Sequence, residues 1–162
     1  MNKIFWGLLF LLIDIKIGSF SITPSFIGCI LIAVGMKEVE DSAVFRKARP
    51  LAVVFGVWSA VFWLIRVNHW AVGLIGNVLL LALTYQIMSG VKELETVRRK
   101  DLMAGTLRKA WYVEAVCAVI VYLLGIFAHL AVAAVLIGFV AMVIYVVAFY
   151  QCKKALNDEN VD

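Results

Sequence analysis

The sequence has few of the residues that a soluble enzyme or a disulfide-stabilised domain requires. Of its 162 residues, two are proline and 16% are charged, and its three cysteines, Cys29, Cys117 and Cys152, form no C-x-x-C pair. An odd number of widely spaced cysteines indicates neither a disulfide framework nor a zinc site. We therefore expect three buried free thiols and predict no metal site.

Motifs for catalysis and for nucleotide binding are also missing. The sequence contains no H-E-x-x-H and no G-x-S-x-G, which excludes the common patterns of zinc proteases and serine hydrolases. Asp14 is the one aspartate within an apolar segment, so a single chain cannot form the paired carboxylates of an aspartyl protease. We predict no catalytic residue, no cofactor and no enzymatic activity.

Apolar residues are abundant instead. They make up 64% of the chain, whereas an average soluble domain has roughly 45–50%. A soluble protein of this length could not bury so much apolar surface, because its surface-to-volume ratio is too high. The composition predicts an all-α integral membrane protein, with residues 1–162 forming a single transmembrane domain. The net charge of +4 reflects basic loops of a membrane protein and does not predict nucleic-acid binding.

Two long apolar segments each predict a pair of transmembrane helices. Segment 111–150 carries Glu114 as its one charge within 40 residues. As a single helix it would be about 60 Å long, twice the thickness of the hydrocarbon core. We predict a hairpin with a tight turn near residues 128–130. Segment 51–88 is interrupted by the polar residues 66–69 and predicts another hairpin.

The N-terminal segment predicts a shorter hairpin over about residues 4–36. Its apolar runs, 4–13 and 26–36, are short for a membrane crossing, and Pro24 suits the first turn of the second helix. The pair either crosses the membrane as short helices, the interpretation we favour, or is re-entrant. A secretory signal peptide is the alternative for residues 1–21, but Asp14 and Lys16 follow the apolar run and no A-x-A site is present.

The basic residues predict the orientation of these six helices. Thirteen of the fifteen Lys and Arg residues lie on the side that holds both termini and the loops 37–50 and 89–110: Lys3, Lys37, Arg46, Lys47, Arg49, Lys92, Arg98, Arg99, Lys100, Arg108, Lys109, Lys153 and Lys154. Lys16 and Arg66 lie on the other side. Because cytoplasmic loops are enriched in Lys and Arg, both termini are predicted to be cytoplasmic.

Similar short motifs flank the hairpins and indicate an internal repeat. R-K-A occurs at 46–48 and 108–110, and G-M-K-E-V-E at 35–40 resembles G-V-K-E-L-E at 90–95. Hairpins that enter from the same side would form a parallel repeat about an axis along the membrane normal. The alternative is convergence, because the flanks of membrane helices are commonly rich in Lys, Arg and Glu.

Four charged residues within the apolar segments form a candidate intramembrane polar site: Asp14, Lys16, Arg66 and Glu114. A charge at the membrane centre costs at least about 2.5–3.5 kcal/mol, so such residues are candidates for function. We place Asp14 and Lys16 in the outer third of the first helix. Asp14 should face the bundle interior and pair with Arg66 or Lys16. A structural pair is the favoured interpretation, and a solute or ion path is the alternative.

One N-terminal element is familiar. The stretch D-I-K-I at 14–17, followed by P-S-F-I-G-C-I-L-I at 24–32, resembles the N-terminus of uncharacterised small polytopic membrane proteins of low-GC Gram-positive bacteria. The resemblance implies a multi-pass protein of the bacterial plasma membrane, and it implies no specific activity. Ser25 stands where an acidic residue would be expected after the proline.

Two classes of function remain open. The chain is either a small-solute or ion transporter or channel, or an accessory subunit of one. Alternatively it is a non-catalytic interaction or regulatory protein that scaffolds a membrane partner. Its expected partners are the lipid bilayer and either another membrane protein or a second copy of itself. The segment 91–102 has helical periodicity, and we expect it to lie along the membrane surface, where it could contact a partner.

Overall fold

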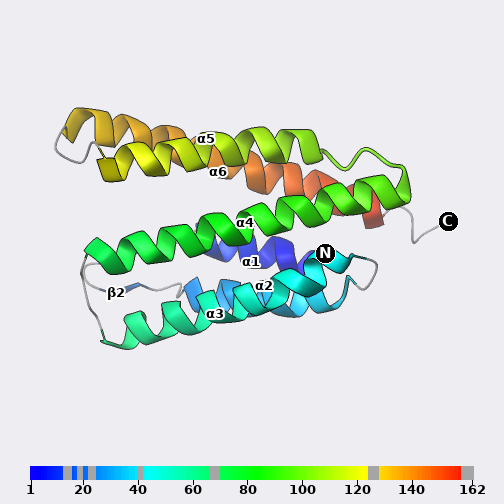
Figure 1. The fold of residues 1–162 in the computed structure, drawn as a ribbon, viewed down its shortest axis with the longest axis horizontal. Helices are drawn as coiled ribbons and strands as arrows, with labels where there is room; N and C mark the ends of the chain where they lie inside the picture. Colours follow the sequence, from blue (N-terminus) through cyan, green and yellow to red (C-terminus); the bar gives the residue numbers. More distant parts are fainter. Residues whose placement is uncertain are drawn as a thin grey trace. The chain divides into compact units, whose positions relative to one another are not determined.

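The computed structural model describes residues 1–12, 16–17, 20–21, 25–39, 42–65, 70–123 and 128–157. This part of the chain consists almost entirely of six helices (Figure 1), which are α1 (Asn2–Leu12), α2 (Ser25–Lys37), α3 (Ala43–Ile65), α4 (Trp70–Arg98), α5 (Ala104–Leu123) and α6 (Ala128–Asn157). Two short strands, β1 (Lys16–Ile17) and β2 (Phe20–Ser21), lie between α1 and α2 in the sequence. The chain divides into two compact units, Met1–Lys100 and Asp101–Asp162.

Three of the described helices, α3, α4 and α6, are long and apolar enough to cross a membrane. The helices α1 and α2 are apolar but shorter. The 20-residue helix α5 is not among the three, and its sequence explains why, because it contains Arg108, Lys109 and Glu114. For the part of the chain that the structure describes, the prediction of an all-α fold with six helices is confirmed. Six membrane crossings are not established, because only three described helices qualify.

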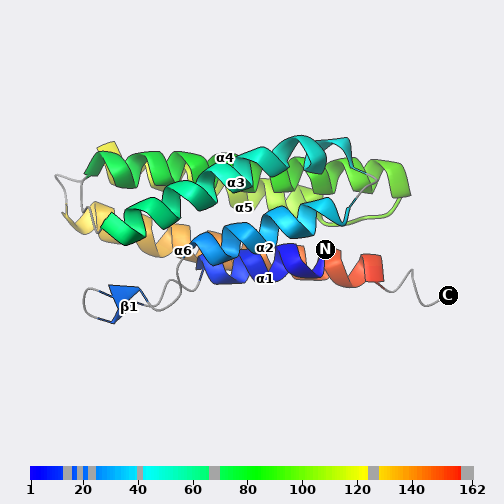
Figure 2. The same ribbon diagram turned by 90° about the horizontal axis from the view of Figure 1, so that it is seen from below.

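In the first unit, α1 and α2 pack closely along their length (Figure 2). Glycines allow this approach: a Cβ atom added to Gly7 would lie 2.6 Å from the carbonyl oxygen of Gly28, and one added to Gly35 would lie 2.7 Å from the backbone nitrogen of Ile4. Real Cβ atoms essentially never come so close to another atom. Helices in membranes associate largely through such packing, because lipid is as apolar as their side chains. Ile4, Leu8 and the α2 residue Ile32 are completely buried.

The first helix is shorter than predicted. It ends at Leu12, and β1 pairs with β2 in antiparallel register, Lys16 opposite Ser21 and Ile17 opposite Phe20. The placement of Lys16 in the outer third of the first helix is therefore wrong. β-branched residues favour extended backbone, and Ile17 is one of the two residues of β1.

The helix α3 packs against α2 on one side and against α4 on another. At the first contact, a Cβ on Gly56 would lie 3.2 Å from Cβ of Cys29. At the second contact, the ring of Phe45 occupies the space next to Gly90, where a Cβ would lie 2.6 Å from its Cε1 atom. Phe45 is completely buried. Small residues on one helix thus receive larger groups from the next, as is typical of membrane helix contacts.

The N-terminus of α3 lies within the predicted loop 37–50, because the helix continues through Pro50 to Ala43. Ser42 caps it: the Ser42 hydroxyl oxygen accepts a hydrogen bond from the Phe45 N–H at 3.2 Å. The Ser42 hydroxyl donates in turn to the carboxylate of Glu93 in α4. Oε2 of Glu93 also accepts from the Val44 N–H at 3.0 Å, so α4 supplies an anion to the positive end of the α3 dipole.

The helix α4 continues without interruption beyond the predicted span, to Arg98. Val91 and Leu94 are buried within the structure, so this segment packs as part of α4. The helical part of the segment 91–102 therefore ends at Arg98, and its expected place along the membrane surface stays a prediction. The helix ends at Arg99, which has a φ of 50°, and the Lys100 N–H donates to the Glu95 carbonyl at 3.3 Å. Such a bond, six residues to one, is the Schellman termination that usually contains glycine.

The second unit is built from α5 and α6, which pack against each other. A Cβ on Gly138 would lie 3.4 Å from Cβ of Cys117, so a small residue again marks the contact. The predicted turn at 128–130 falls instead within the first residues of α6, because α5 ends at Leu123 and α6 begins at Ala128.

Candidate functional site

The predicted intramembrane polar site falls mostly outside the part of the chain that the structure describes. Asp14 and Arg66 lie outside the described residues, and Lys16 lies in β1, for which only the backbone is described. The expected pairing of Asp14 with Arg66 or Lys16 therefore remains a prediction.

Glu114 is the one member of that set with a described side chain. It lies in α5, in the second unit, and its Oε2 atom is buried without a hydrogen-bond partner among the described residues. A buried polar atom without a partner costs free energy and calls for an explanation. Glu114 thus remains a candidate for a proton-binding or cation-binding role.

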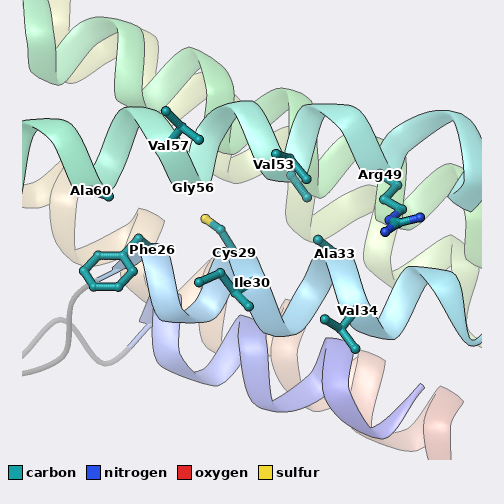
Figure 3. A pocket seen from close by; sticks show the side chains of 11 residues that line it. Phe26, Cys29, Ile30, Ala33, Val34, Arg49, Val53, Gly56, Val57 and Ala60 are labelled. Carbon is teal, nitrogen blue, oxygen red and sulfur yellow. The ribbon is translucent and has the colours of Figure 1, made fainter.

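A second candidate site, which the sequence did not indicate, is a groove between α2 and α3 in the first unit. Its volume is about 360 Å³, and Figure 3 shows the side chains that line it. One helical stripe from each helix forms its walls. The α2 stripe consists of Phe26, Cys29, Ile30, Ala33 and Val34. The α3 stripe consists of Arg49, Ala52, Val53, Gly56, Val57 and Ala60.

The positions of these residues explain why a groove forms. In both stripes the positions follow the i, i+3, i+4, i+7 spacing of one helix face, so the two faces oppose each other along several turns. The small residues Ala33, Ala52 and Gly56 are buried or nearly so and leave space between the helices. Val53 and Val57 are 50% and 59% exposed. The groove is therefore open along its side.

The groove has one charged lining residue, Arg49, at the end next to Val34 (Figure 3). The Arg49 side chain is exposed and makes no ion pair with any residue that the structure describes. At the opposite end, Phe26 packs edge-on against Trp63 with ring centroids 5.9 Å apart. The groove thus runs from a cation at one end to an aromatic pair at the other, between apolar walls.

The length of the groove follows from helix geometry. From Arg49 to Ala60 the rise along α3 is about 16 Å, which is roughly half the thickness of a bilayer's hydrocarbon core. The helix α3 contains Gly56 and Ala60, a small-x-x-x-small pair of the kind that permits close helix approach in membranes, but no such motif was used as a prediction of the groove. The sequence alone did not indicate it, because a space between two helices depends on the side chains that both of them contribute.

Polar contacts also join the ends of helices in the first unit. Besides the capping of α3 by Glu93, Lys3 at the start of α1 forms an ion pair and hydrogen bond with Glu38, just after α2. The hydrogen bond from Lys3 lowers the pKa of Glu38. Both contacts join one helix to another, and none of the side chains that form them lines the groove.

Comparisons with protein-family models, with curated proteins and with solved structures find no match to this chain.

Proposed function

We propose that the chain is a multi-pass protein of the bacterial plasma membrane that acts, without catalysis, as an accessory or regulatory subunit of a membrane partner. The supporting observation is the character of the groove between α2 and α3. Its lining is apolar except for Arg49, whereas a pathway for polar solutes would require polar groups along its length. An apolar groove that opens laterally fits contact with lipid or with another membrane protein.

The use of charged side chains in the first unit supports the same proposal. Glu93 caps α3, and Lys3 pairs with Glu38 across the ends of α1 and α2. These groups hold helix ends together at the side that carries the basic loops. They are structural ties, and they leave the long apolar helices available for contacts within the bilayer.

The proposed topology has six helices in three hairpins, with both termini in the cytoplasm. The distribution of 13 of the 15 Lys and Arg residues on one side supports it. The contacts of α1 with α2, α3 with α4 and α5 with α6 fit three hairpins. We also propose that the second and third hairpins form a parallel repeat, since R-K-A lies near the start of both α3 and α5.

A second candidate function is transport or conduction of a small cation or proton. The observation that favours it is the buried Oε2 atom of Glu114, which has no hydrogen-bond partner in the described part of the chain. A carboxylate within a membrane domain is a recurring element of proton and cation pathways. In this case Glu114 would bind the transported ion or proton.

One experiment separates the two candidates. The purified full chain is reconstituted into liposomes, and proton and cation flux is measured under an imposed potential for the native sequence and for Glu114→Gln. In parallel, the chain is cross-linked in native membranes and its cross-linked proteins are identified. The accessory role requires that liposomes containing the chain show no more flux than protein-free liposomes. It also requires that one membrane protein is cross-linked to the chain in a constant ratio. Flux that is lost in Glu114→Gln, with no such partner, would refute it.

A further inference from the structure

We infer that the groove between α2 and α3 binds one anionic phospholipid, with an acyl chain between the two helices and the headgroup phosphate at Arg49. The proposal names a lipid site on the surface of the protein and holds whether the chain regulates a partner or conducts an ion. It rests only on the proposed insertion of α3 into the membrane.

The walls of the groove match an acyl chain in polarity. Apart from Arg49, the lining has no charged side chain, and it consists largely of aliphatic groups such as Ile30, Val34 and Val57. Ile30 and Val57 are more than half exposed, so a ligand can enter from the side. A hydrocarbon chain is the ligand that a bilayer supplies to such a surface at high concentration.

The dimensions of the groove match one leaflet. Its length of about 16 Å along α3 is close to half of the roughly 30 Å hydrocarbon core. The aromatic contact between Phe26 and Trp63 lies at the end away from Arg49. A chain that entered with its headgroup at Arg49 would therefore end near the middle of the membrane.

The charge at one end of the groove selects the headgroup. Arg49 lies at the end of α3 that carries the basic residues, and its guanidinium can donate two parallel hydrogen bonds to a phosphate. Lys37 continues the α2 stripe one turn beyond Val34 at the same end. Basic pockets between membrane helices at the cytoplasmic side are typical sites for anionic headgroups.

Native mass spectrometry of the full chain in mild detergent tests the inference with two lipids of identical acyl chains, phosphatidylglycerol and phosphatidylcholine. We expect one phosphatidylglycerol retained per chain in preference to phosphatidylcholine. Arg49→Gln should lower phosphatidylglycerol retention about tenfold, as expected for loss of a charge-assisted contact. Lys47→Gln is the matched control, because Lys47 is an exposed cation of the same helix end that does not line the groove.

A second pair of variants tests the apolar part of the site. Val53→Trp should fill the groove and abolish preferential retention. Val54→Trp should leave it unchanged, because Val54 is similarly exposed, at 55% against 50% for Val53, but does not line the groove. This pair keeps the test decisive even where a change of charge alters folding.

Three results would overturn the inference. The first is that the native chain retains the two lipids equally. The second is that the two variants of either pair have equal effects. The third is that Val53→Trp converts a dimer to a monomer, which would assign the groove to a second copy of the chain. Each variant is first checked for alkali-resistant membrane integration. Failure of the native chain in that check would refute the proposed membrane function, whereas integration without selective lipid retention would refute only the lipid site.

Discussion

The close approach of α1 and α2 gives a quantitative test of the packing. In Gly7→Ala the new Cβ would lie 2.6 Å from the backbone oxygen of Gly28, whereas ordinary contacts begin near 3.4 Å. The helices must therefore separate. Overpacking typically costs about 1–3 kcal/mol, and alanine recovers roughly 0.5–1 kcal/mol of the backbone entropy that glycine loses in a helix. The middle of each range, about 2 kcal/mol lost and about 0.75 kcal/mol recovered, gives an expected net loss of about 1 kcal/mol.

Gly105→Ala is the matched control for this prediction. Gly105 lies in the first turn of α5, and a Cβ there meets nothing within 4 Å. The substitution should be neutral or stabilise the chain by up to about 1 kcal/mol. Thermal unfolding of both variants in detergent is monitored by circular dichroism. A change of 1 kcal/mol is expected to shift the Tm by about 2–4 °C. An unchanged or raised Tm for Gly7→Ala would refute the close packing of α1 on α2.

Three further predictions concern the helix ends of the first unit. Ser42→Ala should lower the free energy of unfolding by about 1 kcal/mol, because α3 loses its cap. The loss should be smaller in a Glu93→Gln background, because the two side chains belong to one hydrogen-bond network. Equal losses in both backgrounds would show that the two side chains act independently. Arg99→Gly should raise the Tm, since glycine adopts the observed φ of 50° without strain; a lower Tm would contradict that termination. The hydrogen bond from Lys3 lowers the pKa of Glu38 below the usual 4.5. The ion pair should therefore stabilise the chain above pH 4.5, and this stabilisation should be lost as the pH falls through the lower pKa of the folded state. Unfolding curves measured at several pH values should show this dependence for the native sequence and not for Glu38→Gln.

The sequence predicted the long helices because their signal is local. A long apolar run placed in lipid satisfies its backbone groups as a helix. The segment 66–69, which contains three polar residues, lies between the end of α3 at Ile65 and the start of α4 at Trp70. The start of α3 was missed because Pro50 and the charges around it resemble a loop. Pro50 lies inside α3 as its eighth residue, beyond the first turn where proline is tolerated without loss, so the helix continues there without a hydrogen bond from residue 50 to the carbonyl of residue 46.

The contacts between helices could not be predicted in the same way. The capping of α3 by Glu93 joins residues about 50 positions apart, and nothing in the sequence near Glu93 indicates Ser42 as its partner. The groove could not be predicted for the same reason, since its shape depends on small residues of α2 and α3 that face each other. The candidate polar site was chosen from charge and depth, and of its four residues the structure describes only the Glu114 side chain.

The most direct test of the proposed membrane topology is the accessibility of single cysteines in intact cells. The three native cysteines are buried, and they are replaced before His69→Cys and Lys100→Cys are introduced separately. A membrane-impermeant thiol reagent should label residue 69 in intact cells and residue 100 only after the membrane is permeabilised, because the proposed topology places the basic loops in the cytoplasm. Labelling of residue 100 but not of residue 69 in intact cells would contradict the proposed topology and the assignment of the groove to the cytoplasmic leaflet.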